Sequence, residues 1–317
     1  MISVLLTTYN AAEYLPFSIR SILNQTHKNF ELLIIDDGSD DNTQEIVESF
    51  RDNRIKYIKI QHAGRSKALN KGLNICRYDW VALIDADDIA HPRRLEKQFL
   101  KNLNSNEIVI TSCVYFENMR PIFKIDVRNL TFPRDLILHQ PFPNSVIYNR
   151  NFILENGGYD ENINVAEDYE LWLRIMNKVK FISVNETLMF YRNTKNSLSR
   201  KNIQKTNREI YKIQQPFYDD LGKHFNIADE KTKNIYRGWR EYFFGSPSLA
   251  RRYWIKPMSI LFNIRILLAF LMTFFPVKFI EKFKQSEVKL RLNYLFKKIN
   301  GENKSDELEI KNILKSI

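Results

Sequence analysis

The sequence predicts an α/β fold with a mostly parallel sheet, covered by helices on both faces and followed by an all-helical C-terminal extension. Strand and helix patterns alternate from the first residue, and strands that alternate with helices of about 10–15 residues form βαβ units. The short apolar runs are rich in Ile and Val, as in strands that are buried on both faces. From about Asn202 onward only helical patterns follow.

The elements of the first part follow from their periodicity, because strands are short β-branched runs and helices repeat apolar residues every three to four positions. The expected strands are Ile2–Thr7, Phe30–Ile35, Ile55–Ile60, Trp80–Ile84 and Ile108–Phe116. The expected helices are Ala12–Gln25, Asn42–Arg51, Arg65–Cys76 and Pro92–Leu103.

Past Pro121 the alternation loosens. A Pro-bearing loop leads into a strand at Ser145–Tyr148, and Gly157-Gly158 predicts a turn. A helix follows from Glu167 to about Lys178, and then come two strands, Phe181–Val184 and Leu188–Tyr191. We therefore expect a catalytic domain at residues 1–200, with halves at about 1–117 and 118–200, and a helical region at 201–317.

Composition and charge separate the two regions. Of the 317 residues 44% are apolar, which supports a real core, and two cysteines cannot build a disulfide framework, which indicates a reducing compartment. No basic segment precedes the apolar residues at the N-terminus, so we expect no secretory signal. Residues 1–199 carry 24 Lys+Arg and 25 Asp+Glu, whereas residues 200–317 carry 24 and 12. The basic excess of the second region indicates an anionic partner.

Residues Val81 to Asp88 read Val-Ala-Leu-Ile-Asp-Ala-Asp-Asp and are the most informative stretch. A buried strand ends in three carboxylates, which repel one another unless a cation lies among them. Mg²⁺ and Mn²⁺ bind one or two carboxylates together with substrate phosphates. Open α/β sheets bind ligands at the carboxyl ends of their strands. The pattern predicts a metal–diphosphate site; the alternative is a solvated turn before the helix near Pro92.

Seven short motifs follow one another across residues 1–200. They are Leu6-Thr7-Thr8-Tyr9-Asn10, Ile35-Asp36-Asp37-Gly38-Ser39, Gly64-Arg65-Ser66-Lys67-Ala68-Leu69-Asn70-Lys71-Gly72, Asp85-Ala86-Asp87-Asp88, Gly157-Gly158-Tyr159-Asp160, Glu167-Asp168-Tyr169-Glu170-Leu171-Trp172 and Tyr191-Arg192. Each alone is weak, but in this order they resemble the family 2 inverting glycosyltransferases with the GT-A fold, of the bacterial polysaccharide and lipid-linked glycan type. No Gly-x-Gly-x-x-Gly follows the first strand, which argues against a dinucleotide oxidoreductase.

The resemblance implies a nucleotide-sugar donor, with UDP-sugar expected. It places Thr7, Tyr9 and Asp37 at the uridine, where a carboxylate can accept the imide N–H and an aromatic ring can face the base. The neighbouring Asp36 is expected to hold the turn. Arg65 and Lys67 are candidate donor contacts at a helix N-terminus; the alternative for each is a solvated helix face.

The resemblance also implies the catalytic groups. Asp85 and Asp87 match the family's Asp-x-Asp, with Asp85 toward the ribose and Asp87 as the ligand of Mn²⁺ or Mg²⁺. Asp88 is the alternative ligand, and spacing does not decide between them. Asp168 corresponds to the general base and Glu167 to a group that orients the acceptor; a helix cap is the alternative for both.

One motif departs from the family pattern. Two residues after Arg192 a His is common, and this chain has Thr194. Candidate replacements are Arg192, Ser197, Ser199 and Arg200. His139 and Asn144 are more simply read as loop residues than as sugar contacts.

The basic helical region predicts contact with an anionic membrane surface. Residues 251–299 carry 11 Lys/Arg and two Glu, and the apolar run Ile266–Phe275 is shorter than the roughly 20 residues that span a bilayer. Residues 277–299 read as a basic amphipathic pair. The alternative is a helical subdomain or a homo-oligomer contact. Nucleic acid is not expected, because no nucleic-acid module is recognisable.

Together these observations predict a metal-dependent, inverting hexosyl- or N-acetylhexosaminyltransferase with a glycan or lipid-linked acceptor. We expect it to be cytoplasmic and peripheral on the inner face of the cell membrane. The alternatives are a nucleotidyltransferase on a related fold and a non-catalytic, membrane-bound sugar-nucleotide binder.

Overall fold

The computed structural model describes residues 1–117, 120–130, 132–137, 145–194, 203–255, 264–275 and 312–313. In this part of the chain nine strands form one sheet in the order β3-β2-β1-β4-β8-β6-β9-β5, with β7 paired to β6. The first four strands are β1 (Ile2–Thr8), β2 (Phe30–Asp36), β3 (Ile55–Lys59) and β4 (Trp80–Asp85). They are mutually parallel, as predicted.

The first helices join these strands and cover the two faces of the sheet. They are α1 (Leu15–Leu23), α2 (Thr43–Ser49) and α3 (Arg65–Ile75). Alternation along β4 divides the core: Val81 and Leu83 pack with α3, whereas Ala82 and Ile84 pack with α1 and α2. Both faces are therefore buried, as the continuous apolar strands predicted.

The rest of the sheet is mixed, which corrects the prediction of a mostly parallel sheet. Its strands are β5 (Ile89–Ala90), β6 (Glu107–Glu117), β7 (Arg120–Ile125), β8 (Ile147–Asn149) and β9 (Lys180–Arg192). Strand β9 is parallel to β6. The other pairs are antiparallel: β8 pairs with both β4 and β6, β7 pairs with β6, and β5 pairs with β9. The regular βαβ crossovers end at β4, so later strands are free to enter in either direction.

Several helices are shorter than predicted, for example α1, which spans Leu15–Leu23 instead of Ala12–Gln25, and two elements differ most. The two strands expected between Phe181 and Tyr191 form the single strand β9, whose register against β6 shifts after Val184. The expected break is therefore a bulge inside one strand. The helix expected over Pro92–Leu103 is only α4 (Arg94–Gln98), whose buried Arg94 and Gln98 side chains donate to the strand carbonyls of Leu83 and Val109.

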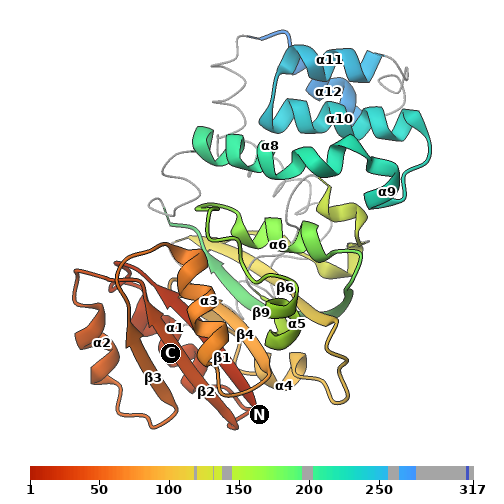
Figure 1. Ribbon diagram of the computed structural model, residues 1–317. Helices are drawn as coiled ribbons and strands as arrows, with labels where there is room; N and C mark the ends of the chain where they lie inside the picture. The colour runs from red at the N-terminus through yellow and green to blue at the C-terminus, as the bar shows by residue number, and fades with distance from the viewer. Residues whose placement is uncertain are drawn as a thin grey trace.

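Helices α5 (Arg150–Glu155) and α6 (Glu167–Ile175), with the short 3₁₀ turns η1 (Val127–Asn129) and η2 (Arg134–Leu136), complete the part of the chain that contains the sheet. Both cysteines, Cys76 and Cys113, are buried. The five described C-terminal helices are α8 (Ile203–Asp219), α9 (Leu221–Phe225), α10 (Glu230–Phe244), α11 (Pro247–Ile255) and α12 (Ile264–Met272). Figure 1 shows α8, α10 and α11 in successive tiers beyond α6.

The C-terminal extension is helical in its described part, as predicted. Within that part, no helix has the length and apolar character needed to cross a bilayer. The amphipathic pair predicted at residues 277–299 lies outside the described residues.

Candidate active site

The ends of three parallel strands bring the motifs to one edge of the sheet. Thr7 of β1 is in register with Asp85 of β4, and Thr8 is in register with Asp36 of β2. The loops after these strands therefore meet, as expected for the ligand-binding edge of an open α/β sheet.

Arg65 is the centre of the site. It is the first residue of α3, directly after Gly64 at φ +96°. Its Nη2 donates to Asp85 Oδ1 at 2.5 Å, and its Nη1 donates to Glu167 at the start of α6. Desolvation acts to lower the pKa of Arg65, but the charges of Asp85 and Asp168 outweigh it and raise that pKa. The guanidinium therefore stays charged and joins two carboxylates that are 20 and 102 residues away along the chain.

The carboxylates after β4 lie in an environment that disfavours their charge. Desolvation and the charge of Asp85 raise the pKa of Asp87 to about 6. Desolvation, with the charges of Asp87 and Asp85, raises the pKa of Asp88 well above its usual value. Arg192 partly compensates: its Nε donates to the carbonyl of Asp87 at 2.9 Å, and its backbone N–H donates to Asp88 Oδ1 at 2.9 Å.

These residues fit a divalent cation. Asp88 is fully buried, and its Oδ2 has no hydrogen-bond partner in the described part of the chain. Among those residues no group of three His, Cys, Asp or Glu could enclose a metal. That is compatible with Mg²⁺ or Mn²⁺, which take one or two protein carboxylates and fill their remaining positions with water and substrate phosphates. Asp87 and Asp88 are the side chains that would supply those carboxylates.

Glu167 and Asp168 open α6, and Ala166 before them has φ +64°. Glu167 is buried and paired with Arg65. Asp168 is only partly buried, and its Oδ1 accepts the backbone N–H of Tyr169 at 2.7 Å. The two neighbours thus differ: Glu167 belongs to the framework of the site, whereas Asp168 keeps access to solvent.

The predicted nucleotide residues form a second group beside Arg65. Tyr9 is 45% exposed and stacks on His62, with ring centroids 4.2 Å apart and planes 18° apart. Asp37 accepts the backbone N–H groups of Ala63 and Gly64 at 2.8 and 2.9 Å. Asp37 therefore also shapes the loop before α3, a role that the sequence did not indicate.

The remaining predicted residues are placed as follows. Asp36 holds the turn, as expected, through Ser39 and through the Tyr57 hydroxyl at 2.5 Å. Lys67 is exposed on α3, and no described contact joins it to the site. Thr194 is buried. His139, Asn144, Ser197, Ser199 and Arg200 lie outside the described residues.

Sequence reasoning missed His62, which stacks on Tyr9 and contacts Asp37 through its Nδ1 at 2.9 Å. The only signal was a histidine two residues before the glycine that begins the motif of α3.

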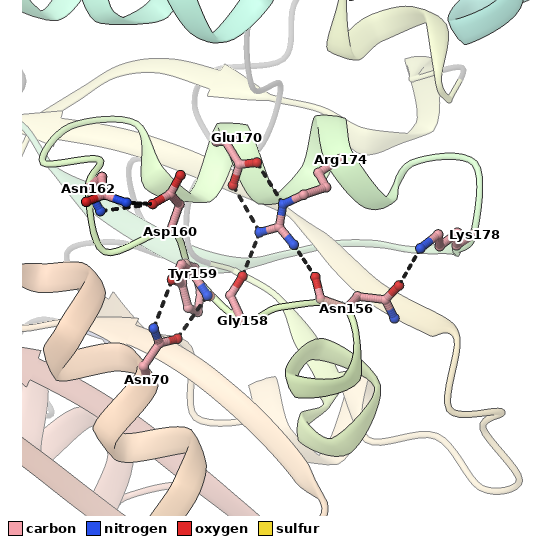
Figure 2. Close-up of polar contacts among 9 residues, drawn as sticks. All are labelled: Asn70, Asn156, Gly158, Tyr159, Asp160, Asn162, Glu170, Arg174 and Lys178. Carbon is pink, nitrogen blue, oxygen red and sulfur yellow. Dashed lines mark hydrogen bonds and ion pairs between the residues drawn. The ribbon is translucent and has the colours of Figure 1, made fainter.

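The Gly157-Gly158-Tyr159-Asp160 motif connects α3 to α6 through hydrogen bonds (Figure 2). The Asn70 side chain of α3 both donates to the carbonyl and accepts the N–H of Tyr159, at 2.8 and 2.9 Å. Arg174 of α6 donates to the carbonyl of Gly158 at 2.6 Å and pairs with Glu170. The turn thereby fixes the two helices whose first residues are Arg65 and Glu167.

The model of the family described as glycosyl transferase family 2 matches residues 3–156. An uncharacterized glycosyltransferase of Methanocaldococcus jannaschii is 35% identical over 263 residues, which cover 77% of this chain and 86% of that protein. The O-antigen biosynthesis glycosyltransferase WbnJ of Escherichia coli is 32% identical over 226 residues, which cover 67% of this chain and 85% of that protein.

Solved structures share the fold. Residues 1–349 of S. aureus TarS in complex with UDP-GlcNAc superpose with a TM-score of 0.60 at 16% identity, over 90% of this chain and 91% of that one. The mannosyltransferase PcManGT of Pyrobaculum calidifontis, in complex with GDP-Man and Mn²⁺, superposes with a TM-score of 0.54 at 16% identity. The match covers 95% of this chain and 88% of that one. The predicted GT-A fold is thus confirmed.

The turn in Figure 2 gives a stability prediction. Gly158 has φ +62°, and a Cβ there would lie 2.7 Å from Asn70 Oδ1. Gly158→Ala should lower the free energy of unfolding by about 1–3 kcal/mol, the usual cost of a strained backbone position. Denaturant unfolding measures it. Gly222→Ala in α9, where φ is not positive, is the matched control and should change little; equal effects of the two variants would contradict the assigned role.

Proposed function

Because the chain belongs to glycosyltransferase family 2, we propose that it transfers a sugar, with inversion, from a UDP-sugar to a hydroxyl of a glycan or lipid-linked acceptor. The observation that carries the proposal is the Arg65 bridge between Asp85 and Glu167. It supports Asp168, the neighbour of Glu167, as the base, since the charge of Asp168 also acts on Arg65. A relative named for O-antigen biosynthesis supports a surface-glycan product.

The donor end of the site would be formed by residues 1–117. Tyr9 offers an exposed ring for the base, and Thr7 and Asp85 lie side by side at the ends of β1 and β4. Asp37 keeps lone pairs for the uracil imide even while it accepts two backbone N–H groups, since a carboxylate has about four acceptor positions. A neighbour solved with UDP-GlcNAc supports a UDP-sugar of the hexosyl or N-acetylhexosaminyl class.

We assign Asp87, with Asp88, to hold Mn²⁺ or Mg²⁺. A bound cation would supply Lewis-acid stabilisation of the leaving diphosphate. The protein's own part is to keep the two carboxylates in a desolvated corner, where a cation offsets the repulsion that raises their pKa values. A neighbour that binds GDP-Man with Mn²⁺ supports this assignment.

Residues 118–200 would form the acceptor half. Asp168 would take the proton of the attacking hydroxyl as the new glycosidic bond forms, while the bond from the anomeric carbon to the diphosphate breaks on the opposite face. One displacement inverts that carbon. Glu167 holds Arg65 and so sets the position of α6. Family membership favours this reaction over the nucleotidyltransferase, and the complete set of Asp85, Asp87 and Asp168 favours it over a non-catalytic binder.

Residues 201–317 would attach the enzyme to the inner face of the cell membrane. The described helices α11 and α12 expose apolar side chains at Leu249, Ile255 and Leu271, and Phe274 is exposed in the turn after α12. Arginines 251 and 252 lie among them in the chain, and basic residues with exposed apolar ones suit an anionic lipid surface.

The first functional prediction concerns the metal. Asp87→Asn should abolish turnover and remove most of the Mn²⁺-dependent gain in UDP affinity, because an amide carries no charge to balance the cation. Isothermal titration of UDP with and without Mn²⁺ measures it. Asp79→Asn, an exposed aspartate just before β4, is the control. An unchanged metal-dependent affinity would refute the assignment of Asp87, and Asp88→Asn would then be titrated.

The second concerns the base. Asp168→Asn should leave UDP affinity intact and lower kcat by roughly 10²–10⁴-fold, the usual contribution of general acid–base catalysis. Single-turnover transfer is the measurement, and Glu155→Gln, at the exposed end of α5, is the control. Near-normal kcat in the variant would mean that another group accepts the proton.

The third concerns the membrane. Flotation of the full chain with vesicles should rise with anionic lipid and fall at high salt, because each basic residue near the surface contributes about 1 kcal/mol. Replacing both Ile255 and Leu271 by Glu should weaken binding, whereas Leu100→Glu in the catalytic part should not. All three side chains are exposed. Failure of the unmodified protein to bind would leave the subdomain or oligomer interpretation of this region.

A further inference from the structure

A polar cavity lies within the helical extension, apart from the candidate active site. Its volume is about 250 Å³, and it lies between α8, α10 and α11. The side chains that line it include Gln215, Asp219, Arg237, Arg240, Glu241 and Tyr253. Asp219 and Gln215 are exposed, so the cavity opens to solvent on the side of α8.

Arg240 gives this cavity a built polar wall. The residue is only 5% exposed, and its guanidinium carbon lies 3.7 Å from the ring centroid of Tyr211 and 4.7 Å from that of Tyr218. Its Nη2 donates to the carbonyl of Tyr211 and to Gln215 Oε1 at 2.7 and 2.8 Å. Its Nε, however, is buried without a hydrogen-bond partner in the described part of the chain. A buried donor without a partner costs about 1–3 kcal/mol, so the position of Arg240 is maintained by its two other hydrogen bonds and by the two tyrosine rings.

The opposite charge is present in the same cavity. Glu241 accepts the Tyr211 hydroxyl at 2.6 Å and the N–H of Ser246 at 3.0 Å, and each of its oxygens retains a lone pair. Asp219 accepts from Gln215 at 2.8 Å. The two arginines and two acidic residues of the lining cancel in formal charge.

The balance of formal charge in the lining indicates the chemical class of the ligand. Because the lining has no net formal charge, it favours neither an anion nor a cation. A neutral ring of hydroxyl groups can accept from the arginines and donate to the carboxylates, and Tyr253 adds an aromatic wall. The volume is below the range of about 300–1,000 Å³ that holds drug-sized ligands, which suits one ring. We propose that the cavity between α8, α10 and α11 is a second saccharide site, which binds a single neutral pyranose unit.

The position of the cavity suggests its use. Gln214, beside the lining residue Gln215, donates to the Tyr169 hydroxyl at 3.0 Å, and Tyr169 directly follows Asp168. Tyr218 lines the cavity and donates to the carbonyl of Ile137 at 2.9 Å. A site on this side of α6 would hold a remote unit of the acceptor glycan; this last step rests on the proposed transferase function, whereas the binding of a saccharide does not.

Direct binding tests the site. The full chain would be titrated with methyl β-D-glucopyranoside, methyl N-acetyl-β-D-glucosaminide and methyl α-D-mannopyranoside, and inorganic phosphate would serve as the anionic probe. Saturation-transfer NMR and calorimetry would measure binding. At least one glycoside should bind. Asp219→Ala and Arg237→Met should weaken it by about tenfold each, equivalent to about 1.4 kcal/mol. Arg252→Met, on α11 but outside the lining, should have no effect.

The outcomes separate this proposal from the proposed function. UDP affinity should be the same in all four proteins, since the nucleotide residues lie in another part of the chain. Glycoside binding that the two cavity variants leave unchanged, or binding of phosphate alone, would overturn the saccharide site even if UDP-sugar turnover is normal. Cavity-dependent glycoside binding without UDP-sugar turnover would uphold the site and refute the transferase.

Discussion

The Arg65 guanidinium links the two halves of the catalytic part, and the geometry of the site depends on that link. It pairs with Asp85, at the end of β4, and with Glu167, at the start of α6. The Arg65 and Glu167 side chains are 21% and 6% exposed. Removal of one partner from a buried ion pair costs about 3–5 kcal/mol. Gly158 and Asn70 hold the same two helices further along their length, so the relative position of α3 and α6 is fixed at two points.

The carboxylate cluster is stable in the folded protein only because other groups compensate for part of its charge. Arg192 donates to Asp88 and to the carbonyl of Asp87, and the rings of Tyr14, Phe17 and Phe116 surround its guanidinium. The pKa values of both aspartates are nevertheless raised by burial. A site with this residual repulsion has more to gain from a bound cation than a solvated turn would have, which favours the metal–diphosphate interpretation of Val81–Asp88.

The sequence predicted the parallel strands and the helices between them, because these follow from local periodicity. It also predicted the edge at which the motifs meet, because that edge follows from where the strands end. It did not predict the antiparallel entry of β8 or the union of two strands into β9, since these depend on partners far away in the chain. In the site, the residue types after β4 indicated a cation by themselves, whereas the role of Asp168 followed only from the family resemblance. The contacts of Asp37 with Ala63 and Gly64, the stacking of His62 on Tyr9 and the exposure of Lys67 follow from loop geometry, which a single sequence does not specify.

The helical extension packs directly against the helix that carries the candidate base, so it is coupled to the site. Tyr169 is buried in α6, and its hydroxyl donates to the carbonyl of Leu136 at 2.7 Å while it accepts from Gln214 of α8 at 3.0 Å. Tyr218 of the same helix donates to the carbonyl of Ile137. A displacement of α8 would therefore break hydrogen bonds one residue away from Asp168. Attachment of the extension to a surface, or a saccharide bound between α8 and α10, would act on the acceptor side of the site through these contacts, while the donor side is held separately by the strands.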